Sequence, residues 1–282
     1  MYHEGPVLAG ARDRMLRHRA DFLSACGWGS ADQIESSLVA RDDAFVTAVR
    51  EGRHVVLWFE HDLYDQLQLL DTLALAGDAG FEDGALELIE TGTFPGRPGF
   101  RGVGELNVPE LASLWPERRA VTDEDTVAAQ AGWAAVRAAD PRALDGLRRD
   151  PPPSRPFLGA AALRFLQELP AVRTGLSRTE RQLLELLADG PMLSGALFVA
   201  SQELEEAPFH GDTWIFRALE QLAPLVVLGE GTAEITEEGR AVLRGEVDRV
   251  SYGIDRWLGG THLEAGAVWR WDDARSSLVA PA

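Results

Sequence analysis

The stretch 54–77, HVVLWFEHDLYDQLQLLDTLALAG, constrains the fold of this chain more than any other part of it. It opens with an apolar run at 54–59, which predicts a buried strand and stops abruptly at Glu60, His61 and Asp62. Leucine and alanine then recur at spacings of three and four residues, which predicts a helix over 62–76. A strand that delivers polar groups at its carboxyl end to the start of a helix is how open α/β sheets build ligand sites. We therefore expect any functional site at this strand end.

A second strand is predicted at 85–90, where Leu86, Leu88 and Ile89 alternate loosely with other residues. Strand, helix and strand at this spacing form a βαβ unit, which implies parallel strands and a right-handed crossover. Two strands are few for a sheet, so we expect that 2–7 is the tail of a further element or that an upstream strand is missing. Further helices are predicted over 10–25, 30–51, 108–114, 122–138 and 140–148. Residues 1–150 are thus expected to form an α/β domain with a small, partly incomplete parallel sheet and helices.

The proline run at 150–154 ends this half, and 151–175 is expected to be a connector with a helix over about 156–168. Ser177 and Glu180 then have the spacing of a capping box, and Gly190-Pro191 ends the helix that they start. Two helices (192–204, 211–222), two strand-like segments (225–228, 233–236) and a last helix (237–247) follow. Three helices and a short hairpin are the element order of a winged helix. We predict a mainly helical, winged-helix-like domain over 176–250 and a Trp-rich extension over 251–282.

Composition narrows the class of protein. The 282 residues suffice for two domains with cores of their own. The one cysteine, Cys26, excludes an intramolecular disulfide and a cysteine-rich zinc site. No apolar run approaches the roughly 18–20 residues of a membrane helix, and the start lacks the features of a signal peptide. We expect a cytoplasmic protein with no membrane association, and no motif specifies a cofactor.

Two interpretations of Glu60, His61 and Asp62 are open. A carboxylate beside an imidazole at a strand end can supply a general base, a proton shuttle or metal ligands. Asp62 also suits the N-cap of the following helix, and Asp65 lies in the first turn, where negative charge is favourable. The helical ligands that would accompany a His-Asp pair in a metal-dependent phosphohydrolase are not evident, so no metal site is predicted. Asp65 and Gln66 are expected to point into the same crevice.

A glycine- and proline-rich loop, TGTFPGRPGFRGVGEL at 91–106, follows the second strand. Loops of this length in compact domains are usually functional or disordered. Arg97 and Arg101 offer planar, bidentate donors for phosphate or carboxylate, and the loop runs into a helix N-terminus capped by Asn107. Gly102-Val103-Gly104 lacks the third glycine of a dinucleotide-binding fingerprint. The loop is interpreted either as anion-binding or as a structural or mobile connection.

Charge argues against a nucleic-acid partner. The chain carries 27 basic residues, all of them Arg, against 45 acidic ones, a net charge of −18. From Arg178 to the end, 18 acidic residues face 9 arginines. The expected recognition helix, GDTWIFRALEQL, has one Arg and two acidic residues, and such a surface repels the phosphate backbone. DNA contact is therefore not expected, and a packing role or a protein partner is favoured for the winged-helix-like domain.

Four segments resemble a known family: HEGPV near the start, LWFEHDLYDQLQLL, the loop GFRGVGEL, and GLSRTERQLLELL. They are similar to members of the uncharacterised bacterial family "domain of unknown function 1835". The tail, with GIDRWLGGTHL and WRWD, is similar to the region after that domain in longer members. The resemblance covers most of the chain and implies a strand and a polar loop upstream of HEGP. It implies no activity and no catalytic residues.

The residues thus favour a small anionic or nucleotide-like ligand at the strand-end crevice. The expected ligand-contacting residues are Glu60, His61, Asp62, Asp65, Gln66, Arg97 and Arg101. One alternative is a hydrolase or transferase that uses Glu60, His61 and Asp62, without an assigned catalytic residue. Another is a winged-helix transcriptional regulator. The ligand hypothesis requires the trio and the arginine-bearing loop to meet on one rim of a parallel sheet.

Overall fold

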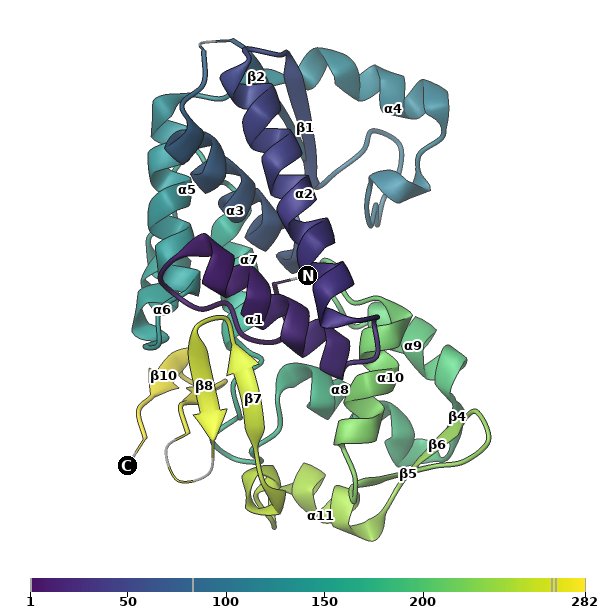
Figure 1. Ribbon diagram of the computed structural model, residues 1–282. Coiled ribbons are helices and arrows are strands. Elements are labelled where there is room, and N and C mark those ends of the chain that lie inside the picture. The colour runs from purple at the N-terminus through teal and green to yellow at the C-terminus, as the bar shows by residue number, and fades with distance from the viewer. Residues whose placement is uncertain (1, 83, 265, 267, 282) are drawn as a thin grey trace. The chain divides into compact units, whose positions relative to one another are not determined.

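The computed structural model describes residues 2–82, 84–264, 266 and 268–281, and the chain divides into two compact units (Figure 1). Unit 1 comprises Met1–Ala162 and Trp257–His262, and unit 2 comprises Leu163–Arg256 and Leu263–Ala282. Helices and small sheets of two or three strands make up the chain, so the predicted mixed α/β architecture is confirmed. The division falls within helix α7 (Leu158–Leu166), whereas the proline run at 150–154 lies inside unit 1.

The sheet of unit 1 has the order β1-β2-β3. Strands β1 (Val55–Glu60) and β2 (Leu86–Thr91) are parallel, with Val55 beside Leu86 and Glu60 beside Thr91. A third strand, β3 (Arg119–Ala120), pairs antiparallel with β2. The sheet is therefore mixed, not purely parallel, and no described strand pairs with the outer edge of β1. The sequence pattern does not indicate β3, because two exposed residues carry no apolar alternation.

Helix α3 (Leu63–Ala79) follows β1 directly and packs against α5 (Asp123–Val136). Leucines at the predicted spacing, including Leu67, Leu70 and Leu73, are at most 2% exposed. Removal of each such side chain from water contributes about 1.5–3 kcal/mol, which fixes the helix against its neighbours. The βαβ unit therefore forms where the apolar pattern predicts it.

The remaining elements of unit 1 surround this unit. They are α1 (Arg12–Ala25), α2 (Ala31–Arg50), the 3-10 turns η1 (Val103–Glu105) and η2 (Trp115–Glu117), α4 (Val108–Leu114) and α6 (Arg142–Arg149). Helix α4 begins as predicted after Asn107, in a capping box with Glu110.

A short segment from far along the chain, Trp257–His262, belongs to unit 1. Gly259 O accepts a hydrogen bond from Val7 N over 2.8 Å, and Gly260 N donates to Val136 O over 2.9 Å. A Cβ on Gly260 would lie 2.0 Å from the carbonyl oxygen of Arg137, so only glycine allows this approach. The predicted extension over 251–282 is thus shared between the two units.

Unit 2 is built on helices α8 (Arg178–Leu186), α9 (Ser194–Gln202), α10 (Asp212–Gln221) and α11 (Glu237–Arg244), with the 3-10 turn η3 (Leu187–Asp189) after α8. Its antiparallel sheet has the order β4-β6-β5, from β4 (Met192–Leu193), β5 (Val226–Leu228) and β6 (Thr232–Ile235). The capping box of Ser177 and Glu180 is present as predicted. Buried leucines from α8, α9 and α10 form its core.

The C-terminal part contains the 3-10 turn η4 (Arg249–Tyr252) and four short strands. These are β7 (Asp255–Leu258) paired with β8 (Thr261–Glu264), and β9 (Arg270–Asp272) paired antiparallel with β10 (Ser277–Val279). Trp271 is 2% exposed. Within the described parts of the chain, every helix is too short or too polar to cross a lipid bilayer.

Candidate functional site

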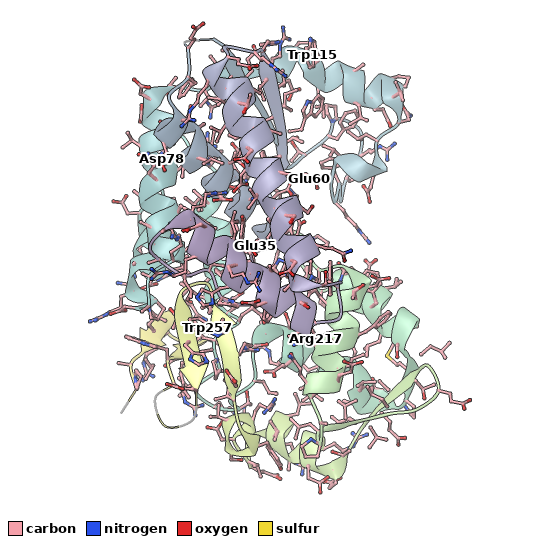
Figure 2. All side chains as sticks on the ribbon, in the orientation of Figure 1. Glu35, Glu60, Asp78, Trp115, Arg217 and Trp257 are labelled. Carbon is pink, nitrogen blue, oxygen red and sulfur yellow. The ribbon has the colours of Figure 1, made fainter. Side chains whose placement is uncertain are left out.

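The carboxyl ends of β1 and β2 position the predicted trio in unit 1. Glu60 is the last residue of β1, where Figure 2 labels it, and His61 and Asp62 lead directly into α3. Residues alternate between the two faces of a strand. Glu60 accordingly shares a face with Trp58, which packs against the loop, and Glu90 of β2 lies on the opposite face. The strand end therefore presents polar groups on both faces of the sheet.

Asp62 is the N-cap of α3. Its Oδ1 accepts a hydrogen bond from Asp65 N over 3.0 Å, as the structural interpretation predicted. Burial, together with the nearby carboxylates of Asp65 and Glu60, outweighs the backbone hydrogen bonds and raises the pKa of Asp62 to about 7. The capping residue thus also carries a carboxyl group that changes protonation near neutral pH.

Glu60 and Asp65 complete an acidic cluster. Asp65 Oδ2 accepts a hydrogen bond from Glu60 N over 2.6 Å, and Glu60 Oε1 accepts one from Val103 N over 2.9 Å. Burial raises the pKa of both carboxyl groups. A Cβ on Gly102 would lie 1.9 Å from Glu60 Oε2, so glycine is required for the loop to approach. The loop at 91–106 therefore does meet the trio, through backbone atoms at Gly102 and Val103.

Gln66 joins the first turn of α3 to both strands. Its Nε2 donates to Glu60 O over 2.8 Å and to Glu90 Oε1 over 2.9 Å, and its side chain is 1% exposed. These contacts hold the strand ends in place, and they use both N–H groups of the amide. Gln66 therefore holds the ends of β1 and β2 together and has no N–H group left for a ligand.

His61 is half-buried at the rim. Its ring lies 5.8 Å from the ring of Phe157 in an edge-on arrangement, and a Cβ on Gly92 would lie 2.9 Å from its Cγ. Burial lowers the pKa of His61, so the imidazole is neutral at pH 7. Its Nδ1 has no hydrogen-bond partner among the residues described. The ring is therefore held by packing, and the Nδ1 atom that lacks a described hydrogen-bond partner is itself buried.

The structure engages the guanidinium group of Arg97 away from the trio. Arg97 Nη2 lies 2.7 and 2.8 Å from the two carboxylate oxygens of Glu110, and its Nη1 donates to Glu105 O. Glu110 belongs to the capping box of α4, which closes that helix N-terminus. Arg101 is exposed, and its backbone N–H donates to Glu105 Oε2. Arg97, which was expected to bind a ligand, therefore stabilises the loop and α4. Apolar contacts of Phe94, Phe100 and Val103 also hold the loop in place.

Arg155 is a cation at this end of the sheet that the sequence pattern does not reveal. Its side chain is fully buried, Nη2 donates to Asp125 Oδ1 over 2.6 Å, and Nη1 lies 3.6 Å from Glu90 Oε2. Burial lowers the pKa of Arg155. Among the described residues its Nε and Nη1 find no hydrogen-bond acceptor. No pattern could have shown this, because a single Arg after a proline run normally lies in solvent.

A groove of about 370 Å³ runs along the outer edge of β1 and contains Asp65. Leu57, Trp58 and Phe59 of β1 form one wall, and α2 and α3 contribute Phe45, Gln68 and Thr72. Small-molecule pockets are typically about 300–1,000 Å³ and combine apolar walls with a few polar groups. The groove has this character, and it begins at the strand end where the sequence predicts a site.

An ionic network lines the same groove. Arg12 forms a two-pronged pair with Asp71, at 2.7 and 3.0 Å, and its Nε lies 2.5 Å from Asp42. Tyr2 donates its hydroxyl proton to Asp71, and Arg41 contacts both Asp42 and the Tyr2 hydroxyl. Burial first, then the charge of Asp71, raises the pKa of Tyr2.

One signal for this network was present in the sequence. Asp71 stands four residues after Leu67 and three before Ala74, within the apolar face of α3. A carboxylate in such a position is almost never buried without a cationic partner. The partners Arg12 and Arg41 could not be chosen from pattern alone, since they come from two other helices.

Comparisons with known proteins assign no function to the residues of this site. A scan against protein-family models and searches of curated proteins and solved structures gave no match for this chain. Among the described residues, no group of three or more His, Cys, Asp or Glu side chains is arranged to hold a metal ion.

Proposed function

We propose that unit 1 binds a small nucleotide-like ligand in the groove along β1. One observation carries this proposal: a single groove contains the guanidinium groups of Arg12 and Arg41, aromatic walls, and the carboxylate of Asp65. Asp65 and Asp71, the partner of Arg12, lie about 9 Å apart along the axis of α3 at 1.5 Å per residue. A ligand with an anionic group at one end and amino or hydroxyl groups at the other matches this spacing.

Arg41 is the residue proposed to contact the anionic group. Its side chain is 44% exposed, and its Nε and Nη2 are engaged by Asp42 and Tyr2. Its Nη1 makes no hydrogen bond within the described part of the chain, so two N–H donors of this half-exposed side chain are left for a ligand. The anionic ligand expected from the sequence is thus assigned to an arginine of α2 in place of the loop arginines.

The acidic cluster is proposed to receive the other end of the ligand. Amino and hydroxyl groups donate to carboxylates, and Asp65 lines the groove beside Asp62 and Glu60. Burial raises the pKa of all three carboxyl groups, so bound donors would stabilise the charged forms that burial disfavours. This supports a ligand with a basic or donor-rich portion, such as a nucleobase.

Calorimetric titration with adenosine monophosphate tests the proposal. We expect saturable binding, weakened at least tenfold by Arg41→Gln and by Asp65→Asn. Arg50→Gln is the matched control, because Arg50 is an exposed arginine at the C-terminal end of α2 and does not line the groove. No saturable heat with the unaltered protein, or equal weakening by all three substitutions, would refute ligand binding in the groove.

The second candidate function is catalytic and rests on Asp62. A carboxyl group with a pKa near the working pH is suited to general acid–base catalysis, and the neutral His61 adjoins it. A hydrolase or transferase using Glu60, His61 and Asp62 is therefore the alternative. It predicts slow turnover of a bound nucleotide that Asp62→Asn abolishes while the affinity is preserved.

For unit 2 we propose a winged-helix module that binds a protein partner. The order of α8, α9, α10 and the sheet β4-β6-β5 supports this fold, and the excess of acidic residues opposes DNA binding and a regulator role. Leu193 and Val227 on the sheet are 63% and 59% exposed, which suits protein contact. Membership of the "domain of unknown function 1835" family is likewise proposed, on the segments that resemble it.

A further inference from the structure

The outer edge of β1 carries backbone groups that point away from the sheet. Val55 N donates to Ala85 O over 2.8 Å, which fixes the hydrogen-bond pattern between β1 and β2. In a parallel ladder alternate residues bond the same neighbour, so the backbone groups of Val56, Trp58 and Glu60 point to the outer edge. Among the described residues, no other strand pairs with this edge.

The last of these three positions is already engaged by α3. Asp65 Oδ2 accepts from Glu60 N over 2.6 Å, and Gln66 Nε2 donates to Glu60 O over 2.8 Å. The N–H and C=O of Trp58 have no hydrogen-bond partner within the described ranges of the chain, although the residue is half-buried. Backbone groups in such a place are satisfied by water or by a ligand.

The peptide group of Trp58 borders the groove along β1, whereas its indole does not face it. The indole packs on the other face of the sheet, where its ring centroid lies 6.5 Å from that of Trp115. Leu57 and Phe59 alternate with Trp58 and line the groove together with residues of α2 and α3. Trp58 also lines the groove, so the part of it that a ligand meets is the backbone.

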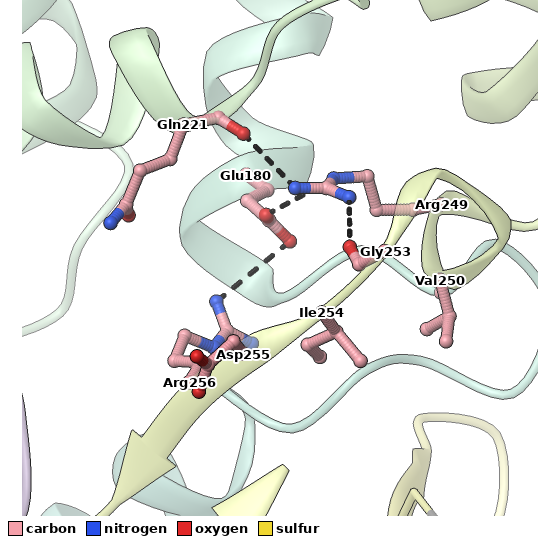
Figure 3. A pocket seen from close by; sticks show the side chains of 9 residues that line it. Glu180, Gln221, Arg249, Val250, Gly253, Ile254, Asp255 and Arg256 are labelled. Carbon is pink, nitrogen blue, oxygen red and sulfur yellow. Dashed lines mark hydrogen bonds and ion pairs between the residues drawn. The ribbon is translucent and has the colours of Figure 1, made fainter. Parts of the chain in front are cut away.

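The cavity of unit 2 shown in Figure 3 is a contrast, because its polar groups compensate one another. Glu180 lies 3.5 Å from Arg249 and 3.9 Å from Arg256. Arg249 also donates to the backbone oxygens of Gln221 and Gly253. The edge of β1 has polar groups left for a ligand, and this cavity does not hold a comparable set.

The direction of β1 orders the polar groups along the groove. Trp58 N–H lies toward the amino end of the strand, and Trp58 C=O lies toward the carboxyl end, where the carboxylate of Asp65 follows. Helix α3 connects two parallel strands and therefore runs back along β1. Asp71, with Arg12 and Arg41 around it, accordingly lies toward the amino end. The order along the groove is cation, N–H donor, C=O acceptor and carboxylate.

We propose that this edge of β1 recognises the base of an adenine nucleotide, which rests on the ligand site proposed for the groove. Trp58 N–H donates to the ring nitrogen N1, Trp58 O accepts from the 6-amino group, and Asp65 accepts the second N–H of that group. The 6-amino group then faces the carboxyl end of β1. The sugar-bearing side of the base faces the amino end, where Arg41 contacts the phosphate.

The same order of groups disfavours a 6-oxo base such as hypoxanthine. This base presents an oxygen acceptor at position 6 and an N–H donor at position 1, the reverse of adenine. It pairs with Trp58 only when it is turned round, and its phosphate is then directed away from Arg41. A site that hydrogen-bonds one pattern of donors and acceptors rejects the other because buried polar groups would lose their partners.

Calorimetric titration with adenosine monophosphate and inosine monophosphate tests the inference, since the two nucleotides differ only in the base. We expect adenosine monophosphate to bind at least tenfold more tightly, and its derivative dimethylated at the 6-amino group to bind as weakly as inosine monophosphate. Trp58→Phe is the matched control, because it keeps the peptide group and alters only the ring on the other face. It should preserve the ratio of affinities.

The outcomes separate this inference from the ligand site itself. Equal affinities for the two nucleotides, both weakened by Arg41→Gln, would overturn recognition of the base and leave the ligand site standing. Loss of the ratio in Trp58→Phe would assign recognition to the indole and overturn the role of the backbone. No saturable heat with either nucleotide would overturn both proposals.

Amide hydrogen exchange at single residues, followed by nuclear magnetic resonance, gives a second readout. Trp58 N–H should exchange faster than Leu57 N–H in the free protein, because Leu57 is bonded to β2. Saturating adenosine monophosphate should slow the exchange of Trp58 at least tenfold, whereas ribose 5-phosphate, which lacks the base, should not. Exchange at Trp58 that saturating nucleotide leaves unchanged would contradict the contact.

Discussion

Two buried carboxyl groups, one in each unit, have pKa values that are shifted in opposite directions. Asp62 of unit 1 is 6% exposed and has a pKa of about 7, whereas Glu168 of unit 2 is 8% exposed and has a pKa of about 2. Burial raises both values. Arg164, at 2.5 Å, and other cations then lower the pKa of Glu168. Among the described residues, the groups that act on Asp62 are carboxylates, which raise its pKa, and backbone N–H groups, which lower it.

The different pKa values of Glu168 and Asp62 distinguish a structural ion-pair network in unit 2 from a candidate functional site in unit 1. Arg164 pairs with Glu168 and Glu205, stacks over Phe209, and donates to Thr179, so that every charge has a partner. Among the described residues, no arginine forms an ion pair with Glu60, Asp62 or Asp65 of the strand-end cluster. Since perturbed groups that serve only the fold are usually paired, an unpaired cluster at a strand end favours a ligand or a reaction.

Breaking the paired network should have the largest effect. Arg164→Leu leaves Glu168 and Glu205 buried without their cation, which should lower the free energy of unfolding of unit 2 by about 3–5 kcal/mol. Urea denaturation followed by amide hydrogen exchange in α8 and α10 measures it. Arg244→Gln is the exposed control. A loss below about 1 kcal/mol would show that the network is not what holds this unit together.

Acid should weaken unit 2 by about 3 kcal/mol through Glu168 alone. Its folded pKa, about 2, lies below its ordinary value of 4.5, so the stabilisation is complete above pH 4.5 and is lost as pH falls toward 2. His210 acts in the same direction, because burial lowers its pKa from 6.5 to about 3. Hydrogen exchange of unit 2 between pH 7 and pH 3 checks this. The opposite pH trend would contradict the assigned pairing.

Asp62→Asn should stabilise unit 1 at high pH, because Asp62 has a raised pKa whereas Glu168 has a lowered one. The folded pKa of about 7 lies above the ordinary 3.8, so the contribution of Asp62 is complete below pH 3.8 and is lost as pH rises through 7. Asn caps helices as well as Asp does and carries no charge. At pH 8 the variant should therefore be more stable by on the order of 2 kcal/mol. Thermal unfolding at pH 8 and pH 4 tests it; destabilisation at pH 8 would mean that capping by the carboxylate outweighs its burial.

Arg97→Gln should have the smallest effect. The Arg97–Glu110 pair is partly exposed, so its loss should cost about 1 kcal/mol or less. Affinity for adenosine monophosphate should not change, because the guanidinium is engaged away from the groove. Calorimetry on this variant beside Arg41→Gln provides the measurement, and a weakening as large as that of Arg41→Gln would restore Arg97 to the site.

The elements that could be predicted correctly are those with strong local signals. The apolar run and leucine spacing at 54–77 specified β1 and α3. The N-cap at Asn107 and the capping box at Ser177 specified where α4 and α8 begin. Strand β3 has two exposed residues and no such signal. It forms because β2 offers a free edge, which is a tertiary property.

The candidate site shows the same limit. Glu60, Asp62 and Asp65 could be placed together because they flank one strand end. Arg97 and Arg155 could not be assigned, because the partner of an arginine depends on which distant carboxylate it meets: Glu110 for the first and Asp125 for the second. The sequence pattern offered the loop arginines as anion-binding candidates, but it did not indicate that Arg41 of α2 would line the groove along β1.

The titration of the Asp62 carboxyl carbon by nuclear magnetic resonance, with and without adenosine monophosphate, tests the central claim most directly. A midpoint near pH 7 that moves when the nucleotide is added is the result expected for an uncompensated acid in a ligand site. A midpoint near the ordinary value of 3.8, or one that the nucleotide leaves unchanged at saturating concentration, would contradict it.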